Sequence, residues 1–467
     1  MNPEERYKRI KEHLAEENPI LVEVMEKFEE LDKIGYQSGL LDESETYISD
    51  ISWWPLISVL GTFSTGKSSF INLYLKNRVQ ISGNQAIDDK FTVICYGPTK
   101  SVTTLPGLAL DADPRFPFYN ISEEIKKVDT GEGNRVNQYL QLKTLNSKHI
   151  KGKIIIDSPG FDADSQRDAI LKMTDYIINM SDLVLIFFDA RHPEPGAMRD
   201  TLNHLVGTAM RHRDANKILY ILNQIDTTAK EDNLEDVIGA WQRALSQQGL
   251  VSGNFFSIYN EEAAEQITDP AVAERLKRKK DEDIERIYER MDTVSVERAY
   301  RIIKTLEDAA GGLKKRIPKV QAAFQSLSKK VIFADLTLLV LVAAAVGGLL
   351  FEFEALRTLF ANLAASPAAA AAVVVVAVVA AMVIHYKIRG WFAGRMVKKW
   401  MDRDEDITRS MMIYTKGWKS LMRVALPSWS RLKIEALDAL VVQSKRSIQK
   451  LNDQFVSPSG IEEEAES

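Results

Sequence analysis

The stretch LISVLGTFSTGKSSFIN, Leu56 to Asn72, decides the fold of the first half of the chain. An apolar run ends at Gly61, and Gly66-Lys67-Ser68 then opens a second apolar stretch, which completes the pattern G-x-x-x-x-G-K-[ST] between a strand and a helix. The glycines let the backbone wrap a phosphate with its N–H groups turned inward, and the N-terminus of the following helix adds to the attraction. This pattern predicts a phosphate-binding loop, the P-loop.

A second strand end supplies the acidic partner of this loop. The segment KIIIDSPGFDADS, Lys153–Ser165, is an apolar strand that ends in Asp157-Ser-Pro-Gly160. D-x-P-G alone is a common turn, but its place on an apolar strand after a P-loop favours a role in nucleotide binding. Asp157 would then hold Mg²⁺ through water, and the Gly160 N–H would sense the γ-phosphate.

The P-loop side chains have separate predicted roles. Lys67 supplies positive charge to the β- and γ-phosphates, and the Ser68 hydroxyl is placed to ligate Mg²⁺, the expected cofactor. The predicted metal ligands are Ser68 and Asp157, and the predicted catalytic residues are Lys67 and Ser64. The predicted phosphate-binding residues are Gly61, Ser64, Thr65, Gly66, Lys67, Ser68, Ser69 and Gly160.

A third strand end predicts the base. The segment ILYILNQIDTT, Ile218–Thr228, carries Asn223-Gln224-Ile225-Asp226, which resembles the N/T-K-x-D base-reading motif. The Asp226 carboxylate can accept hydrogen bonds from the guanine ring N–H and exocyclic amine, which adenine cannot both supply. Gln224 replaces the usual lysine and can still cover the ring. We therefore predict that Asn223 and Asp226 bind the base, with a plain polar turn as the alternative reading.

Two long apolar runs follow. Val331–Phe351 contains one charge, Asp335, and Ala368–Tyr386 contains none unless His385 is protonated. Each reaches the ~20 residues that cross a ~30 Å hydrocarbon layer; a pair of buried core helices is the alternative. Lysines precede the first run and lysines and arginines follow the second, so the positive-inside rule predicts a hairpin with both termini cytoplasmic and a short loop outside.

Composition bounds the remaining possibilities. The 467 residues, 45% hydrophobic and 27% charged, are those of a folded chain of more than one domain. The net charge of -5 gives no reason to expect nucleic acid. Cys95 is the single cysteine, which fits a reducing, cytosol-facing environment, and the charged N-terminus does not resemble a signal peptide.

The expected organisation has six parts. Residues 1–50 form an N-terminal helical segment, helical over 3–35, and residues 51–262 alternate strands and helices as an α/β domain does. The expected strands are Leu56–Leu60, Ile154–Ile156, Leu183–Phe188, Ile218–Leu222 and Phe255–Ile258. Residues 263–330 are a helical stalk part, 331–386 the transmembrane hairpin, 387–455 a C-terminal helical part, and 456–467 an acidic disordered tail.

These motifs together resemble the dynamin superfamily, and the EHD branch of membrane-remodelling ATPases most. The resemblance runs over about residues 20–315 and rests on GTFSTGKSSFIN, LPGLALDADPRFPF, LVLIFFDARHPEPGAMRDTLNHL, NQIDTTAKEDNLEDVIGAWQRAL and VSVERAYRIIKTLEDA. It implies an α/β P-loop NTPase fold, a dynamin-type G domain, with an α-helical stalk. The transmembrane hairpin gives a layout similar to that of mitofusins.

The chain also departs from the family pattern. The expected switch I threonine is missing from Gly83–Phe91, where Ile87 or Asp88 takes its place. Phe63 stands where dynamins carry a glutamine that helps place water, although the EHD branch also has an aromatic residue there. His192 is read as a loop histidine, and the sequon Asn120–Ser122 is read as unmodified because the domain faces the cytosol.

The resemblance implies a membrane-anchored dynamin-like GTPase that couples nucleotide binding, hydrolysis and G-domain dimerisation to membrane remodelling, tethering or fusion. Its expected partners are GTP, or ATP, and the lipid bilayer, with homo-oligomers formed through the G domain and stalk and no nucleic acid. In a bacterium the expected location is the inner (plasma) membrane. The alternatives are an EHD-like ATPase or a nucleotide-switched membrane scaffold with little hydrolysis. A transporter is disfavoured because the two spans offer no converging polar groups for a pathway.

Overall fold

The computed structural model describes residues 3–42, 45–49, 51–81, 90–112, 116, 136–160, 167–192, 215–250, 253–264, 266–401, 403–415 and 427–456. The chain forms two compact units. The first comprises Met1–Val22 and Ser49–Ile302, and the second comprises Glu23–Ile48 and Ile303–Ser467. The predicted P-loop lies in the first unit and both apolar runs lie in the second.

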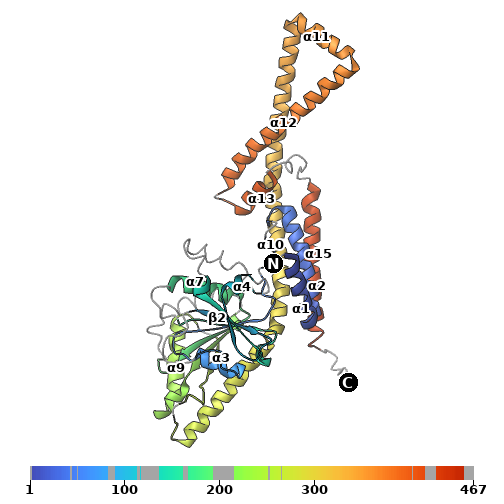
Figure 1. The fold of residues 1–467 in the computed structure, drawn as a ribbon. Coiled ribbons are helices and arrows are strands. Elements are labelled where there is room, and N and C mark those ends of the chain that lie inside the picture. The colour runs from blue at the N-terminus through green and yellow to red at the C-terminus, as the bar shows by residue number, and fades with distance from the viewer. Residues whose placement is uncertain are drawn as a thin grey trace. The chain divides into compact units, whose positions relative to one another are not determined.

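The first unit is built on an eight-stranded sheet with the order β3-β4-β2-β5-β1-β6-β7-β8. Figure 1 shows this sheet with helices on both sides. The strands β5, β1, β6, β7 and β8 run parallel to one another, and β2 is parallel to β4. The pairs β2–β5 and β3–β4 are antiparallel. The strands are β1 Leu56–Gly61, β2 Phe91–Tyr96, β3 Thr103–Pro106, β4 Leu140–Leu145, β5 Ile154–Asp157, β6 Leu183–Asp189, β7 Ile218–Asn223 and β8 Asn254–Ser257.

All five predicted strands are present, with ends that differ by one residue. The strands β2, β3 and β4 are not among the predicted ones. Every residue of β3 is exposed, so no apolar pattern marks it. In β4 the buried Lys143 interrupts the apolar pattern that would otherwise signal a strand.

Helices cover both faces of the sheet. Leu56 and Leu60 of β1 face one core, which includes residues of α7 (Arg167–Met180) and α9 (Leu234–Gln247). Ile57 and Val59 face the other core, which includes α3 (Lys67–Leu75) and part of α10 (Pro270–Glu352). This alternation follows from the two-residue period of a strand. Because β5, β1, β6 and β7 run parallel to one another, their carboxyl ends lie at the same edge of the sheet.

The short helices α4 (Leu108–Ala112) and α6 (Val136–Tyr139), together with the 3₁₀ segments η1 (Lys148–Ile150), η2 (Ala215–Lys217) and η3 (Ile225–Lys230), complete the sheet domain. Helix α1 (Pro3–Glu17) joins the same unit through Arg298 of α10, which is 1% exposed. Arg298 donates to the Trp53 carbonyl and forms a 2.6 Å ion pair with Glu17. Burial opposes ionisation of Glu17, but the His13 hydrogen bond and the Arg298 charge together lower its pKa.

The second unit is a bundle of helices. It contains most of α2 (Pro19–Ser38), the later part of α10, α13 (Glu405–Thr415) and α15 (Pro427–Asn452). Residues far apart in sequence meet here: Lys27 donates to Ser447 at 2.9 Å, Ser410 donates to the Ser38 carbonyl at 2.9 Å, and Lys450 pairs with Glu23. The predicted helical stretches 3–35, 262–330 and 390–455 therefore contain helices, although α10 continues without a break through the first apolar run.

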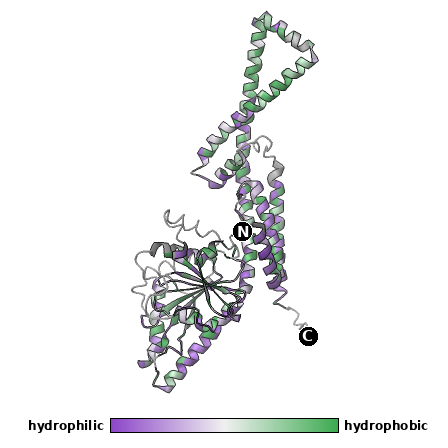
Figure 2. Ribbon diagram, viewed as in Figure 1, coloured by the Kyte–Doolittle hydropathy of each residue, from purple (hydrophilic) through white to green (hydrophobic). Residues whose placement is uncertain are grey.

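Two helices are long and apolar enough to cross a membrane. The most apolar windows of α10 and of α12 (Pro367–Trp400) have mean hydropathies of 2.3 and 2.7, and only 6% and 0% of those windows are buried. Figure 2 shows this apolar stretch along both helices. The alternative of two buried core helices therefore does not describe the structure.

The connection between the apolar runs was predicted to be a short loop, but it contains a helix. Glu354–Ala365 forms the helix α11. Its alanines and leucines are strong helix formers, which explains why this connection becomes helical. Helix α12 then begins after Ser366, whose side chain accepts a hydrogen bond from the Ala369 N–H, with Pro367 in the first turn.

Candidate nucleotide-binding site

The P-loop connects β1 to α3, where the sequence placed it. Ser64 and Gly66 have positive φ angles of 59° and 84°. A Cβ atom on Gly66 would lie 2.1 Å from Nδ2 of Asn223, so both the backbone angle and the close approach of Asn223 require glycine. The loop is thus pressed against the end of β7.

Lys67 lies inside this loop. Its side chain is 7% exposed, and its Nζ donates to the carbonyls of Gly61 and Thr62, each at 2.8 Å. Thr65 Oγ1 also donates to the Thr62 carbonyl, at 2.9 Å. Ser69 lies half-buried in the first turn of α3, one residue after Ser68. The positive charge is therefore fixed at the loop, beside the amino end of a helix.

Two side chains from the end of β7 hold the loop in place. Asn223 Nδ2 donates to the Thr65 carbonyl at 2.8 Å, and Gln224 Nε2 donates to the Ser64 carbonyl at 2.6 Å. We call these two side chains the β7 clamp. Gln224 was expected to cover the base ring, but its side-chain amide instead donates a hydrogen bond to the P-loop, as that of Asn223 does. The contact of Asn223 with the base stays a prediction.

The third base-motif residue, Asp226, lies in η3 and is 7% exposed. The loop after β8 borders it, because the Ile225 N–H donates to the Ile258 carbonyl at 3.3 Å. Hydrogen bonding to Asp189 raises the pKa of Arg191, and the Asp226 charge adds to this effect. Burial raises the pKa of Tyr259, with a further contribution from Asp226. Arg191 and Tyr259 therefore lie within reach of the Asp226 charge, and neither residue was predicted to do so.

Ser68 and Asp157 converge from α3 and β5. The Ser68 hydroxyl lies 3.5 Å from Oδ2 of Asp157, which is almost fully buried. A hydroxyl and a carboxylate are the hard oxygen donors that Mg²⁺ prefers, and the Ser158 hydroxyl beside them is buried without a hydrogen-bond partner among the described residues. These residues fit a magnesium ion, with Ser68 and Asp157 as the residues that would hold it.

Gln80 and Lys143, neither of which was predicted as a site residue, orient Asp157. Gln80 is 1% exposed, and its Nε2 donates to Asp157 Oδ2 at 2.6 Å. Lys143 Nζ donates to Gln80 Oε1 at 2.5 Å and to the Val79 carbonyl at 3.2 Å. Asn72 Oδ1 accepts from the N–H groups of Val79 and Gln80, which fixes this short segment. A lysine in the apolar strand β4 was the one signal of this chain of contacts in the sequence.

Gly160 lies against the P-loop. A Cβ atom there would meet the Phe63 backbone and Cβ at 3.0 to 3.2 Å, so this approach favours glycine and places the predicted γ-phosphate sensor beside the loop. His192 is exposed in the turn after β6, as a loop histidine would be. The switch I residues 83–89 and the sequon Asn120–Ser122 lie outside the described residues.

Comparisons with known proteins agree with this geometry. Residues 57–224 match the family model described as Dynamin family. EH domain-containing protein 2 of Rattus norvegicus is 28% identical over 222 residues, which cover 45% of this chain and 37% of that protein. EH domain-containing protein 1 of Homo sapiens is 26% identical over 179 residues, covering 37% and 31%. The chain thus spans about a third of the length of these curated relatives.

A solved structure of an oligomerised bacterial dynamin pair, described as a mechanism for the long-range sensing and tethering of membranes, aligns over 92% of this chain and 77% of its own, with 14% identity and a TM-score of 0.35. The strand–P-loop–helix geometry and the parallel strands around it define a P-loop nucleotide-binding domain. With the family match, residues 57–224 are a dynamin-superfamily G domain that resembles those of the EHD proteins.

Replacing Lys67 with alanine is expected to abolish triphosphate binding, because it removes the buried cation of the phosphate loop, and to leave the fold intact. Nucleotide titration with the full-length protein measures this, with circular dichroism to check folding. Lys151→Ala, which removes an exposed lysine of the same unit, is the matched control. If Lys67→Ala bound the triphosphate within about threefold of wild type, the P-loop assignment would be wrong.

Gln80→Leu is expected to weaken the apparent affinity for Mg²⁺ by about 10- to 100-fold, because Asp157 loses the hydrogen bond that orients it. The measurement is nucleotide binding as a function of Mg²⁺ concentration. Gln141→Leu is the control, since Gln141 bonds to Thr92 and lies on the same strand as Lys143. Equal Mg²⁺ dependence in the two variants would refute the orienting role of Gln80.

Proposed function

We propose that this protein is a membrane-anchored dynamin-like GTPase that couples nucleotide binding and hydrolysis in its G domain to remodelling, tethering or fusion of membranes. The proposal rests on the presence of two features in the same chain. Its G domain holds Lys67, Ser68 and Asp157 together around a P-loop, and its second unit bears two long apolar helices that are almost wholly unburied.

The proposed chemistry rests on positioning and charge. The P-loop N–H groups and Lys67 bind the phosphates and stabilise the negative charge that grows on them during transfer. Ser68 and Asp157 would hold Mg²⁺, which neutralises phosphate charge when bound. Gly160 packs against Phe63, and its N–H would lie beside the γ-phosphate. Ser64, the other predicted catalytic residue, is held in the loop by the hydrogen bond from Gln224 to its carbonyl.

Guanine is the proposed base. Asp226 is an almost fully buried carboxylate in η3, and a carboxylate matches the two donors of the guanine edge. Adenine would turn the acceptor N1 toward this carboxylate, which is itself an acceptor, so the two groups would oppose each other in a buried site. ATP, the nucleotide implied by the EHD resemblance, is the alternative.

The second unit supplies the proposed membrane anchor and stalk. Residues 331–386 would cross the bilayer twice, with both termini in the cytoplasm, and in a bacterial cell the membrane would be the inner (plasma) membrane. Residues 263–330 and 387–455 would form the stalk, and homo-oligomers would assemble through the stalk and the G domains. The absence of a threonine from Gly83–Phe91 keeps a slowly hydrolysing, nucleotide-switched scaffold as the second candidate.

GTP is expected to outcompete ATP by at least about a hundredfold, because a site that hydrogen-bonds a base edge rejects a base that leaves its groups unpaired. Asp226→Asn should relax this preference. Competition binding of the two nucleotides to wild type and variant gives the answer. Glu231→Gln, an exposed acid beyond the same 3₁₀ segment, is the matched control. Tighter ATP binding that Asp226→Asn leaves unchanged would move the protein to the ATPase alternative.

The hairpin is expected to expose only residues 352–367 to a protease added outside intact cells or spheroplasts. Epitope tags at the two termini, followed by blotting, measure the protection of each end. Detergent-permeabilised cells, in which all parts become accessible, are the control. Cleavage within the first 320 residues before permeabilisation would overturn the proposed topology.

A further inference from the structure

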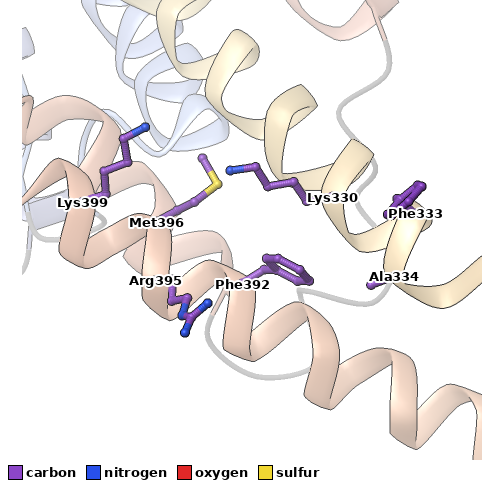
Figure 3. Close-up of a pocket in the computed structure, with 7 residues that line it drawn as sticks. All are labelled: Lys330, Phe333, Ala334, Phe392, Arg395, Met396 and Lys399. Carbon is purple, nitrogen blue, oxygen red and sulfur yellow. The ribbon is translucent and has the colours of Figure 1, made fainter. Parts of the chain in front are cut away.

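The second unit contains a basic pocket where α10 and α12 meet. It has a volume of about 430 Å³ and is lined by Lys330, Phe333 and Ala334 of α10 and by Phe392, Arg395, Met396 and Lys399 of α12. Figure 3 shows Lys330 reaching from α10 toward Met396 on α12. A volume of this size lies within the range of small-ligand pockets.

Three basic residues line this space. Among the described residues, no carboxylate forms an ion pair with Lys330, Arg395 or Lys399. The guanidinium carbon of Arg395 lies 3.9 Å from the centroid of the Trp391 ring, a cation–π contact that orients the side chain. Three like charges without an acidic partner indicate an anionic ligand.

The floor and rim of the pocket are apolar. Met396 is 6% exposed and forms the buried part, whereas Phe333 is 73% exposed at the rim. Phe333 continues directly into the unburied apolar face of α10, which includes Leu336, Leu339 and Val340. A ligand in this pocket therefore meets cations on one side and a long apolar surface on the other.

The sequence position fixes the depth of this pocket in the proposed hairpin. Lys330 immediately precedes the first apolar run, and α12 continues past the second run to Trp400. Just inside, Asp335 and His385 connect the two helices through a 2.6 Å contact. A second pocket of about 400 Å³, lined by Ala334, Lys387, Ile388, Trp391 and Phe392, adjoins the first. Basic and aromatic side chains together are typical of the level of lipid headgroups.

We propose that this pocket binds the phosphate of an anionic phospholipid, with Lys330, Arg395 and Lys399 contacting the phosphate and Phe333 and Phe392 contacting the glycerol and upper acyl chain. This inference rests on the proposed membrane anchoring. A free phosphate would use the three cations but would gain nothing from the apolar rim that joins the apolar helices. A phospholipid, rather than a free phosphate, is therefore the proposed ligand of this pocket.

The test compares two triple variants of the full-length protein. Lys330→Gln, Arg395→Gln and Lys399→Gln together remove the pocket cations. Lys329→Gln, Lys398→Gln and Arg403→Gln together remove the same charge from exposed positions next to them that do not line the pocket. Each protein is reconstituted in nanodiscs of phosphatidylcholine with phosphatidylglycerol, and native mass spectrometry counts the phosphatidylglycerol that stays bound after detergent exchange.

We expect the pocket variant to retain at least about fivefold less phosphatidylglycerol than the control variant and wild type. Equal losses in both variants, or no loss in either, would overturn the pocket while leaving the anchor in place. Displacement of the lipid by soluble glycerol phosphate alone would assign the site to free phosphates instead. Failure of the wild type to integrate into bilayers, shown by alkaline extraction, would refute the anchor itself and is scored separately.

Discussion

The close contact between the P-loop and the end of β7 is the constraint on which the nucleotide site depends. Gly66 is pressed against Asn223, and the β7 clamp holds the carbonyls of Ser64 and Thr65. A loop with positive φ angles at Ser64 and Gly66 needs such external bonds to keep its shape, because this backbone is unfavourable for a serine. The clamp can form only because β1 and β7 lie on either side of β6 and run parallel to it. The shape of the phosphate site therefore depends on the strand order of the sheet.

The metal-binding side of the site is likewise held in place by hydrogen bonds from neighbouring strands and loops. Asp157 stands at the end of β5, on the opposite side of β1 from β6, and reaches Ser68 at the start of α3. Gln80 and Lys143 then fix the carboxylate through hydrogen bonds that cross from the segment after α3 to β4. Such outer contacts set the orientation of a metal ligand, so the site extends to strands that carry no motif.

Candidate site residues could be named from the sequence where a motif is continuous, but not where contacts cross the fold. The P-loop, Asp157 and the Asn223–Asp226 segment could be named because each is a short run at the end of an apolar strand. Gln80 could not be named, since its meaning depends on Lys143, which only the pairing of β4 with β2 brings near. The clamp by Gln224 was missed for a related reason: a side chain expected to cover the base is, in the fold, within reach of a P-loop carbonyl. Strand β3, which is exposed throughout, lacked any apolar pattern to read.

In the proposed hairpin, the Asp335–His385 contact bears on how the chain enters a membrane during synthesis. An aspartate at the centre of an apolar helix costs about 2.5–3.5 kcal/mol on insertion, and Asp335, four residues after the start of the first apolar run, would cost less. Asp335 emerges from the ribosome well before His385, so for an interval the first helix would carry its acidic group without the partner it meets in the fold at 2.6 Å. Arrival of the second helix would then favour lateral release of the first, and the two helices would leave the translocation machinery as a pair.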